Sequence, residues 1–149
     1  MIYDFSFSNF RSYKNEATVD FLAKPITEFQ DSLIKTPDGT FVLPVCAIYG
    51  PNGGGKSTVL MALKSLQEIV VDPLIQMVFM KNKNEKLASA TIDELRDGIK
   101  GNTQKISYYK WDKESADKPT VFSILFGVKE KKYRYEIALK DENLSLIHI

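Results

Sequence analysis

The chain has 149 residues, of which 44% are hydrophobic, and a formal net charge of +1 at pH 7. This length and composition predict one compact globular domain with a real core. The near balance of 20 Lys and Arg against 19 Asp and Glu excludes a strongly basic field, so charge gives no support to DNA or RNA as a partner, although it does not exclude them.

Cysteine content and hydropathy indicate the compartment. The single cysteine, Cys46, allows no disulfide within the chain, which is typical of a reducing environment. No run of eighteen apolar residues occurs, and the N-terminus "MIYDFSFSNF" lacks the basic start and apolar stretch of a signal peptide. We therefore expect a cytoplasmic protein that has no membrane partner.

The N-terminal residues alternate between hydrophobic and polar side chains. Tyr3, Phe5 and Phe7 recur at a period of two, which predicts a strand with one buried face. A second alternation over residues 17–21 follows the polar turn "RSYKNE", so the two segments are expected to form an antiparallel hairpin. Residues 24–40 contain two prolines and an Asp-Gly pair, and they are expected to form a loop.

Next come a predicted strand and a predicted helix. The apolar stretch "FVLPVCAIY", residues 41–49, predicts a buried parallel strand that includes Cys46. After residue 56, Leu60, Leu63 and Leu66 recur at helical spacing, which predicts an amphipathic helix. The helix is expected to end near Asp72, because Pro73 disfavours helical backbone in the residue before it.

Between these two elements lies the glycine-rich string "GPNGGGKST", Gly50 to Thr58, which fits G-x-x-x-x-G-K-[ST]. A random chain of this length would show that pattern about once in two hundred. Backbone N–H groups of such a loop, together with the start of the following helix, form an anion-binding concavity. Lys56 is expected to reach the β- and γ-phosphates of a nucleotide as the catalytic lysine, and the Ser57 hydroxyl is expected to ligate Mg²⁺.

The remaining elements are predicted from shorter signals. Residues 73–101 are expected to be helical, with a capping box at "TIDE", residues 91–94. Lys81, Lys83 and Lys86 there suit either a solvated helix face or an acidic partner. "ISYYKW", "TVFSILFGV" and the alternation over residues 133–139 predict strands. "KEKK", residues 129–132, predicts a hairpin tip whose lysines are either simply solvated or in contact with phosphates.

These motifs support a family resemblance. "SNFRSY", the hairpin, "CAIYGPNGGGKST" and its helix resemble the N-terminal lobe of ABC-type ATPases of the SMC, RecF and OLD group, and more closely the bacterial AAA family ATPases associated with phage defence. The resemblance implies an α/β P-loop NTPase: a partial ABC-type ATPase head (lobe I) with an antiparallel β subdomain and a phosphate-loop strand-helix unit. That lobe would span residues 1–144, with residues 145–149 as a non-native or truncated tail.

The resemblance also implies a nucleotide site with ATP and Mg²⁺ as cofactors. The residues expected to bind them are Gly50, Pro51, Asn52, Gly53, Gly54, Gly55, Lys56, Ser57 and Thr58. Arg11 matches a basic residue that lies near the nucleotide in relatives; it is equally well explained as a residue of the hairpin turn. Related heads dimerise around two ATP molecules, so a homodimer of heads in the full-length protein is expected.

A hydrolytic carboxylate is not evident. Asp72 ends the predicted helix, about 20 Å from the phosphates, and Asp141 and Glu142 follow an apolar run that Lys140 interrupts. An ABC signature sequence is also lacking. We therefore expect the first portion of a larger ATPase, in which hydrolysis drives head dimerisation, in phage defence or DNA maintenance. Two alternatives remain: a small P-loop kinase or GTPase, and a nucleotide-binding module without turnover.

Overall fold

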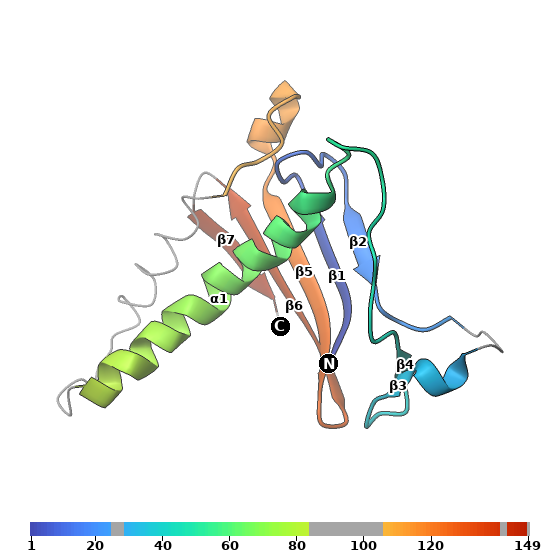
Figure 1. The fold of residues 1–149 in the computed structure, drawn as a ribbon. Coiled ribbons are helices and arrows are strands. Elements are labelled where there is room, and N and C mark those ends of the chain that lie inside the picture. The colour runs from blue at the N-terminus through green and yellow to red at the C-terminus, as the bar shows by residue number, and fades with distance from the viewer. Residues whose placement is uncertain (25–28, 84–105, 141–142, 149) are drawn as a thin grey trace.

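The computed structural model describes residues 1–24, 29–83, 106–140 and 143–148. Its main body is a five-stranded sheet in the order β2-β1-β5-β6-β7, with every neighbouring pair antiparallel (Figure 1). The strands of this sheet are β1 (Ile2–Ser8), β2 (Ala17–Asp20), β5 (Thr120–Val128), β6 (Lys131–Lys140) and β7 (Asn143–His148). The other elements are the 3-10 helices η1 (Gln30–Ser32) and η2 (Lys113–Asp117), the short strands β3 (Ile34–Lys35) and β4 (Phe41–Val42), and the helix α1 (Lys56–Lys83).

Both predicted hairpins are confirmed. Strand β1 pairs with β2 in the register Phe5 to Val19, and β5 pairs with β6 from Thr120 opposite Leu139 to Val128 opposite Lys131. The second hairpin closes through Lys129 and Glu130, and Lys129 has a positive φ of 56°. Tight two-residue hairpin loops need such backbone, because its twist matches that of the flanking strands.

Helix α1 crosses one face of the sheet diagonally, and the core lies between them (Figure 1). The helix contributes Val59, Ala62, Leu66 and Ile69 to this core, in steps of three and four residues. The sheet and its loops contribute Phe5, Phe7, Phe10, Phe122, Ile137 and Leu139. Burial of these large side chains is the main stabilising term of the fold.

Strand β1 departs from its predicted single buried face at Tyr3. The register against β5 shifts between Ile2 and Asp4, as in a β-bulge. Tyr3 therefore lies against Lys132, whose ammonium nitrogen is 4.9 Å from the ring centroid, while Asp4 pairs with Arg134 at 3.1 Å. Tyr3 is only 1% exposed, but it is absent from the core that holds Phe5 and Phe7.

The prediction of a buried parallel strand over residues 41–49 was wrong. Only Phe41 and Val42 are in a strand, β4, and that strand pairs antiparallel with β3. Val45 is 76% exposed, Tyr49 is 91% exposed, and Cys46 is exposed rather than buried. An apolar sequence forms a strand only where a neighbouring strand offers hydrogen bonds, and the described residues offer none to residues 44–49.

Two further predictions of secondary structure were wrong. Helix α1 does not end near Asp72 but runs through Pro73 to Lys83, because the proline removes one hydrogen bond at a finite cost and good helix formers lie on both sides of it. "ISYYKW", residues 106–111, is irregular rather than a strand. Its backbone bonds to the β1–β2 turn, with the Arg11 N–H donating to the Ser107 carbonyl at 2.9 Å.

The tail expected to be non-native takes part in the sheet, since residues 143–148 form β7 and pair with β6. The predicted capping box at residues 91–94, Lys86, Asp141 and Glu142 lie outside the described residues. Within the described ranges, no helix combines the length and the hydropathy needed to cross a bilayer.

Candidate nucleotide site

The glycine loop connects an extended exposed segment to the first turn of α1. Gly53 and Gly55 have positive φ angles of 79° and 83°, which side chains other than glycine rarely adopt. The Gly54 N–H donates to the Pro51 carbonyl at 3.1 Å, which closes a turn within the loop. Helix α1 then begins at Lys56, so the N–H groups of Lys56 and Ser57 in its first turn lie next to the loop.

The glycines of the loop have two different surroundings. A Cβ atom on Gly50 or Gly53 would meet no protein atom within 4 Å, whereas one on Gly55 would lie 2.9 Å from the Tyr13 ring. Open space beside Gly50 and Gly53 is what a loop needs if a ligand approaches its backbone closely. Gly55, in contrast, is required by the protein itself.

Lys56 lies across the loop that precedes it. Its ammonium group donates to the Gly50 carbonyl at 2.8 Å and to the Pro51 carbonyl at 2.7 Å, both at exposed positions. Among the described residues, its ammonium group contacts backbone carbonyls and no carboxylate, so its positive charge is available to an anion.

Ser57 and Thr58 differ in accessibility. Ser57 is exposed, as a metal ligand at the mouth of a site has to be. Thr58 is only 9% exposed, and its hydroxyl forms a 2.9 Å hydrogen bond with the Ser12 hydroxyl. The two adjacent hydroxyls therefore differ: that of Thr58 is bonded to Ser12, whereas that of Ser57 is at the surface.

The β1–β2 turn packs against the glycine loop at one end of the molecule, beside η2 (Figure 1). Phe10 and Tyr13 exchange two backbone hydrogen bonds of 2.9 Å across the turn. Arg11 lies in this turn with a φ of 50°, and its guanidinium is 5.5 Å from the centroid of the Phe10 ring. That position agrees with its expected place in the turn; its contact with nucleotide stays a prediction.

Asn9 connects the turn to the segment before β5. Its side-chain nitrogen donates to the carbonyls of Ser115 and Lys118 at 2.9 and 2.8 Å, and its side-chain oxygen accepts from the Tyr109 N–H at 3.2 Å. Its backbone carbonyl accepts from the Thr120 hydroxyl at 2.7 Å. The residue is 4% exposed, so water cannot reach its polar groups, and these hydrogen bonds satisfy them instead.

An ion pair joins the same two segments. Lys14 and Asp112 approach to 2.6 Å. The hydrogen bond from Lys14 lowers the pKa of the Asp112 carboxyl, and the same bond raises the pKa of Lys14, so the pair stays charged at neutral pH. Because the Lys14 side chain is 45% exposed, water screens the pair, and we assign it a role in orientation rather than a large stability.

Sequence analysis missed Ser12 and Tyr13 as residues that support the loop, and Asn9 as the residue that connects the turn to the segment before β5. Their signal in the sequence is weak: three polar or aromatic residues around one turn, with Ser12 and Tyr13 more than forty positions before Gly55 and Thr58. Only the fold brings the turn against the loop.

The chemistry of the loop suits a nucleoside phosphate with Mg²⁺. The donors present are backbone N–H groups, one ammonium and one exposed hydroxyl, and the sides of Gly50 and Gly53 are open. A cluster of three or more His, Cys, Asp or Glu side chains suited to holding a metal ion does not occur among the described residues. The protein's ligand to Mg²⁺ would thus be Ser57, with phosphate oxygens and water completing the shell.

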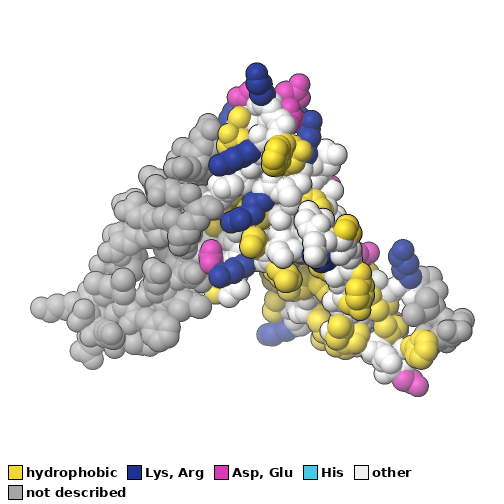
Figure 2. Space-filling model, turned by 45° about the horizontal axis from the view of Figure 1, so that its top comes forward, with side chains coloured by type: hydrophobic (Ala, Val, Ile, Leu, Met, Phe, Trp, Pro, Cys, Tyr) yellow, Lys and Arg dark blue, Asp and Glu magenta, His cyan; other side chains and the backbone are white. Residues whose placement is uncertain are grey.

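On the face that Figure 2 draws, the described residues show no continuous basic patch. In Figure 2, Lys and Arg side chains stand apart on the face drawn, separated by uncharged and hydrophobic residues, with acidic side chains beside them at one end. Phosphate-backbone binding draws on a contiguous basic patch. Lys132, in the hairpin tip predicted to be basic, is paired with Asp38 at 2.8 Å.

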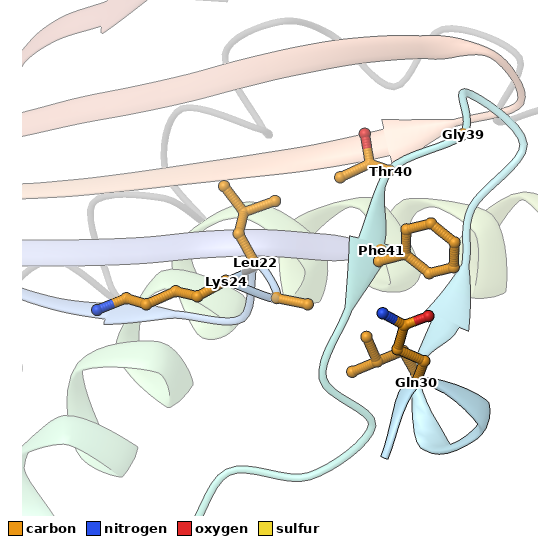
Figure 3. A pocket seen from close by; sticks show the side chains of 8 residues that line it. Leu22, Lys24, Gln30, Gly39, Thr40 and Phe41 are labelled. Carbon is orange, nitrogen blue, oxygen red and sulfur yellow. The ribbon is translucent and has the colours of Figure 1, made fainter. Parts of the chain in front are cut away.

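A pocket of about 520 Å³ lies elsewhere, beside η1 and the β3–β4 turn. Figure 3 shows its lining side chains: Thr40 and Phe41 come from the turn and β4, and Lys24 extends away from them. No residue of the glycine loop lines it, and its polar groups do not converge on one point. It does not have the donor arrangement of the loop.

Comparison with known protein families agrees with the site. A model described as "AAA domain, putative AbiEii toxin, Type IV TA system" matches residues 45–148, and a second model described as "AAA domain" matches residues 5–66. Searches of curated proteins and of solved structures found no match. The first model begins just before the glycine loop and includes the strands β5 to β7. Since it spans more than half of the chain, the protein belongs to this AAA domain family, whose members are P-loop NTPases that bind nucleotide.

Proposed function

We propose that this chain binds ATP together with Mg²⁺ through the loop Gly50 to Thr58. The observation that carries the proposal is the exposed loop itself. Its glycines have a positive φ or open space beside them, and the first turn of α1 follows them directly. Membership of the AAA domain family supports nucleotide as the anion.

Each group of the loop has a role in this proposal. The backbone N–H groups of the loop and of the first turn of α1 bind phosphate oxygens. Lys56 exchanges the carbonyls of Gly50 and Pro51, which it now contacts, for the β- and γ-phosphates. Ser57 provides a hydroxyl to Mg²⁺, which when bound neutralises part of the phosphate charge.

The test is a titration of the chain with a fluorescent ATP analogue and Mg²⁺, with unlabelled ATP and GTP as competitors. Lys56→Ala is expected to raise the dissociation constant at least tenfold, since it removes a charge-assisted contact to phosphate. Preference for ATP over GTP would separate an ATPase from the GTPase alternative.

The matched control is Lys64→Ala, two turns further along the same helix. Lys64 is exposed and pairs with Glu68 at 3.6 Å, so its removal is expected to change affinity less than twofold. A folded chain that shows no saturable binding, or that binds equally well with and without Lys56, would disprove the proposal.

We propose further that hydrolysis belongs to a larger assembly. Val45, Ile48, Tyr49 and Leu60, on either side of the glycine loop, are 41% to 91% exposed. Exposed apolar side chains of this kind favour burial against another protein surface. Hydrolysis in addition needs a carboxylate beside the Mg²⁺. Additional polypeptide that covers these residues and carries that carboxylate, in a dimer of two heads, would meet both requirements.

The assembly is tested by ATP turnover of the product of the full gene against that of residues 1–149. Turnover by the longer product alone, with dimerisation on ATP addition, is the expected result. Turnover of neither, with intact ATP binding, would favour the nucleotide-binding module without hydrolysis. The matching family, which is described as a putative AbiEii toxin of a type IV TA system, favours a role in defence over one in DNA maintenance.

A further inference from the structure

The β1–β2 turn contacts the glycine loop through two neighbouring residues, Ser12 and Tyr13. We propose that these two residues position the phosphate loop, and that Thr58 serves as the partner of Ser12 in this arrangement rather than as a ligand of nucleotide or metal. The inference rests on the proposed function, because it names what sets the geometry of the proposed site.

The first contact is the hydroxyl pair. Ser12 Oγ and Thr58 Oγ1 are 2.9 Å apart, although 46 residues separate them in the sequence. The Thr58 N–H also donates to the Gly55 carbonyl at 2.9 Å. Thr58 is thus held through both its backbone and its side chain, and with it the first turn of α1 that starts immediately after the glycines.

The second contact is steric. Gly55 approaches the turn so closely that a Cβ atom there would lie 2.9 Å from Tyr13 Cε2 and 3.2 Å from Ser12 Oγ. The Tyr13 ring in turn packs against Phe7, with centroids 5.1 Å apart and planes at 73°. Phe7 is 1% exposed and belongs to the core, so a chain of packed groups leads from the core to the loop.

The loop therefore has two halves. Gly55 and Thr58 contact the turn, whereas Pro51, Asn52 and Gly53 are exposed and can meet a ligand. A binding loop held in its bound conformation before the ligand arrives costs less ordering on binding. The positioning pair thus contributes affinity without touching the ligand.

A double-mutant cycle on the 149-residue chain tests this. Ser12→Ala and Thr58→Val each remove one hydroxyl at nearly constant shape, and each is expected to raise the dissociation constant for the fluorescent ATP analogue with Mg²⁺ about fivefold. The double variant is expected to lose no more than either single one, because both remove the same bond. Thr58→Ser restores a hydroxyl and is expected to recover most of the affinity.

Two readouts separate positioning from other roles. Ser123→Ala removes a hydroxyl in the sheet that is buried like that of Thr58 and is bonded to Arg134 at 3.1 Å, and it is expected to lower stability without changing affinity. Thr58→Val is expected to keep the Mg²⁺ dependence of binding, whereas Ser57→Ala is expected to lose it.

Several outcomes would overturn the inference. They are unchanged affinity in folded Ser12→Ala, additive losses in the double variant, a loss of Mg²⁺ dependence in Thr58→Val, or an equal loss of affinity in Ser123→Ala. If ATP binds and Lys56→Ala abolishes binding while Ser12→Ala does not weaken it, only this inference fails. If the folded wild-type chain binds no ATP, the proposed function fails and the inference with it.

Discussion

Tyr3 lies directly over Gly127, so closely that a Cβ atom on Gly127 would be 2.5 Å from the Tyr3 hydroxyl and 2.9 Å from Cε2 of its ring. The same hydroxyl donates to Asp38 at 2.9 Å. The hydrogen bond to Asp38 and the contact with the Lys132 ammonium group both restrict the Tyr3 ring, so it has little freedom to move away from Gly127. Strand β5 thus has a glycine at the position where the bulge in β1 places the Tyr3 ring against the β5 backbone.

Gly127→Ala is expected to destabilise the fold by about 2 kcal/mol, in the range of overpacking in a well-packed interior. Urea denaturation followed by circular dichroism measures the loss. In a Tyr3→Phe background, which removes the nearest atom, the same substitution is expected to cost less. Equal costs in the two backgrounds would show that the hydroxyl contact is not the cause.

The carboxyl group of Asp38 joins the β3–β4 turn to the sheet. Its pKa lies far below the usual range because Lys132 donates to it first of all, followed by Thr36, Thr40 and Tyr3. A carboxyl group with a depressed folded-state pKa contributes stability above its unfolded pKa, near 4, and this stability is lost as the pH falls below that value.

Asp38→Asn is therefore expected to lower the melting temperature by several degrees at pH 7. The gap between wild type and variant is expected to narrow steadily between pH 4 and pH 2. Thermal melts across this range provide the measurement, with the exposed Asp31→Asn as a control that leaves the melting temperature nearly unchanged. A gap that stays constant down to pH 2 would contradict the assignment.

Asn9 combines a left-handed backbone, with φ of 49°, and a buried side chain that serves three partners. Asn9→Ala is expected to cost about 3 kcal/mol, since it leaves buried groups unpaired and places an alanine in a disfavoured conformation. Asn9→Gly keeps the backbone freedom and loses only the bonds, so it is expected to be less harmful by about 1 kcal/mol. Denaturant titrations measure the loss in the free energy of unfolding for each variant. Equal losses in the two variants would contradict the backbone argument.

Gly55→Ala places a methyl group against Tyr13 on backbone of positive φ, at 83°. We expect at least a tenfold loss of ATP-analogue affinity, because the loop has to move away from the turn that holds it. In a Tyr13→Ala background, which removes the neighbouring ring, the same substitution meets mainly the backbone cost of this φ and is expected to lose less affinity. The steric argument fails if Gly55→Ala loses the same affinity in both backgrounds in parallel titrations.

The parts of the fold that followed from the sequence are those decided locally. Alternation along Phe5 and Phe7, or along residues 133–139, specifies which face of a strand is buried, and each hairpin joins neighbours in sequence. The apolar run around Val45 was misassigned because a strand also needs a partner, which composition does not reveal. The aromatic residues near Trp111, which is 86% exposed, were misassigned because their backbone bonds go to the β1–β2 turn.

The candidate site divides in the same way. Gly50 to Ser57 are contiguous, so their spacing alone predicted a phosphate loop. Ser12 and Tyr13 support that loop across more than forty residues, and no periodicity carries such a contact. The bulge that turns Tyr3 away from Phe5 likewise depends on the pairing of β1 with β5, far along the chain.

The order of strands in the sheet also determines when the site can be built. Strand β1 lies between β2 and β5, so Ile2 finds its partner Phe126 only after more than a hundred intervening residues have been made. A two-stranded hairpin alone is marginally stable in water. At ordinary rates of translation, β5 follows the glycine loop after an interval on the order of ten seconds. The glycine loop and the turn that contacts it are thus both synthesised before β5, the strand that pairs with β1, and the pace of this long-range strand pairing sets when their arrangement becomes stable.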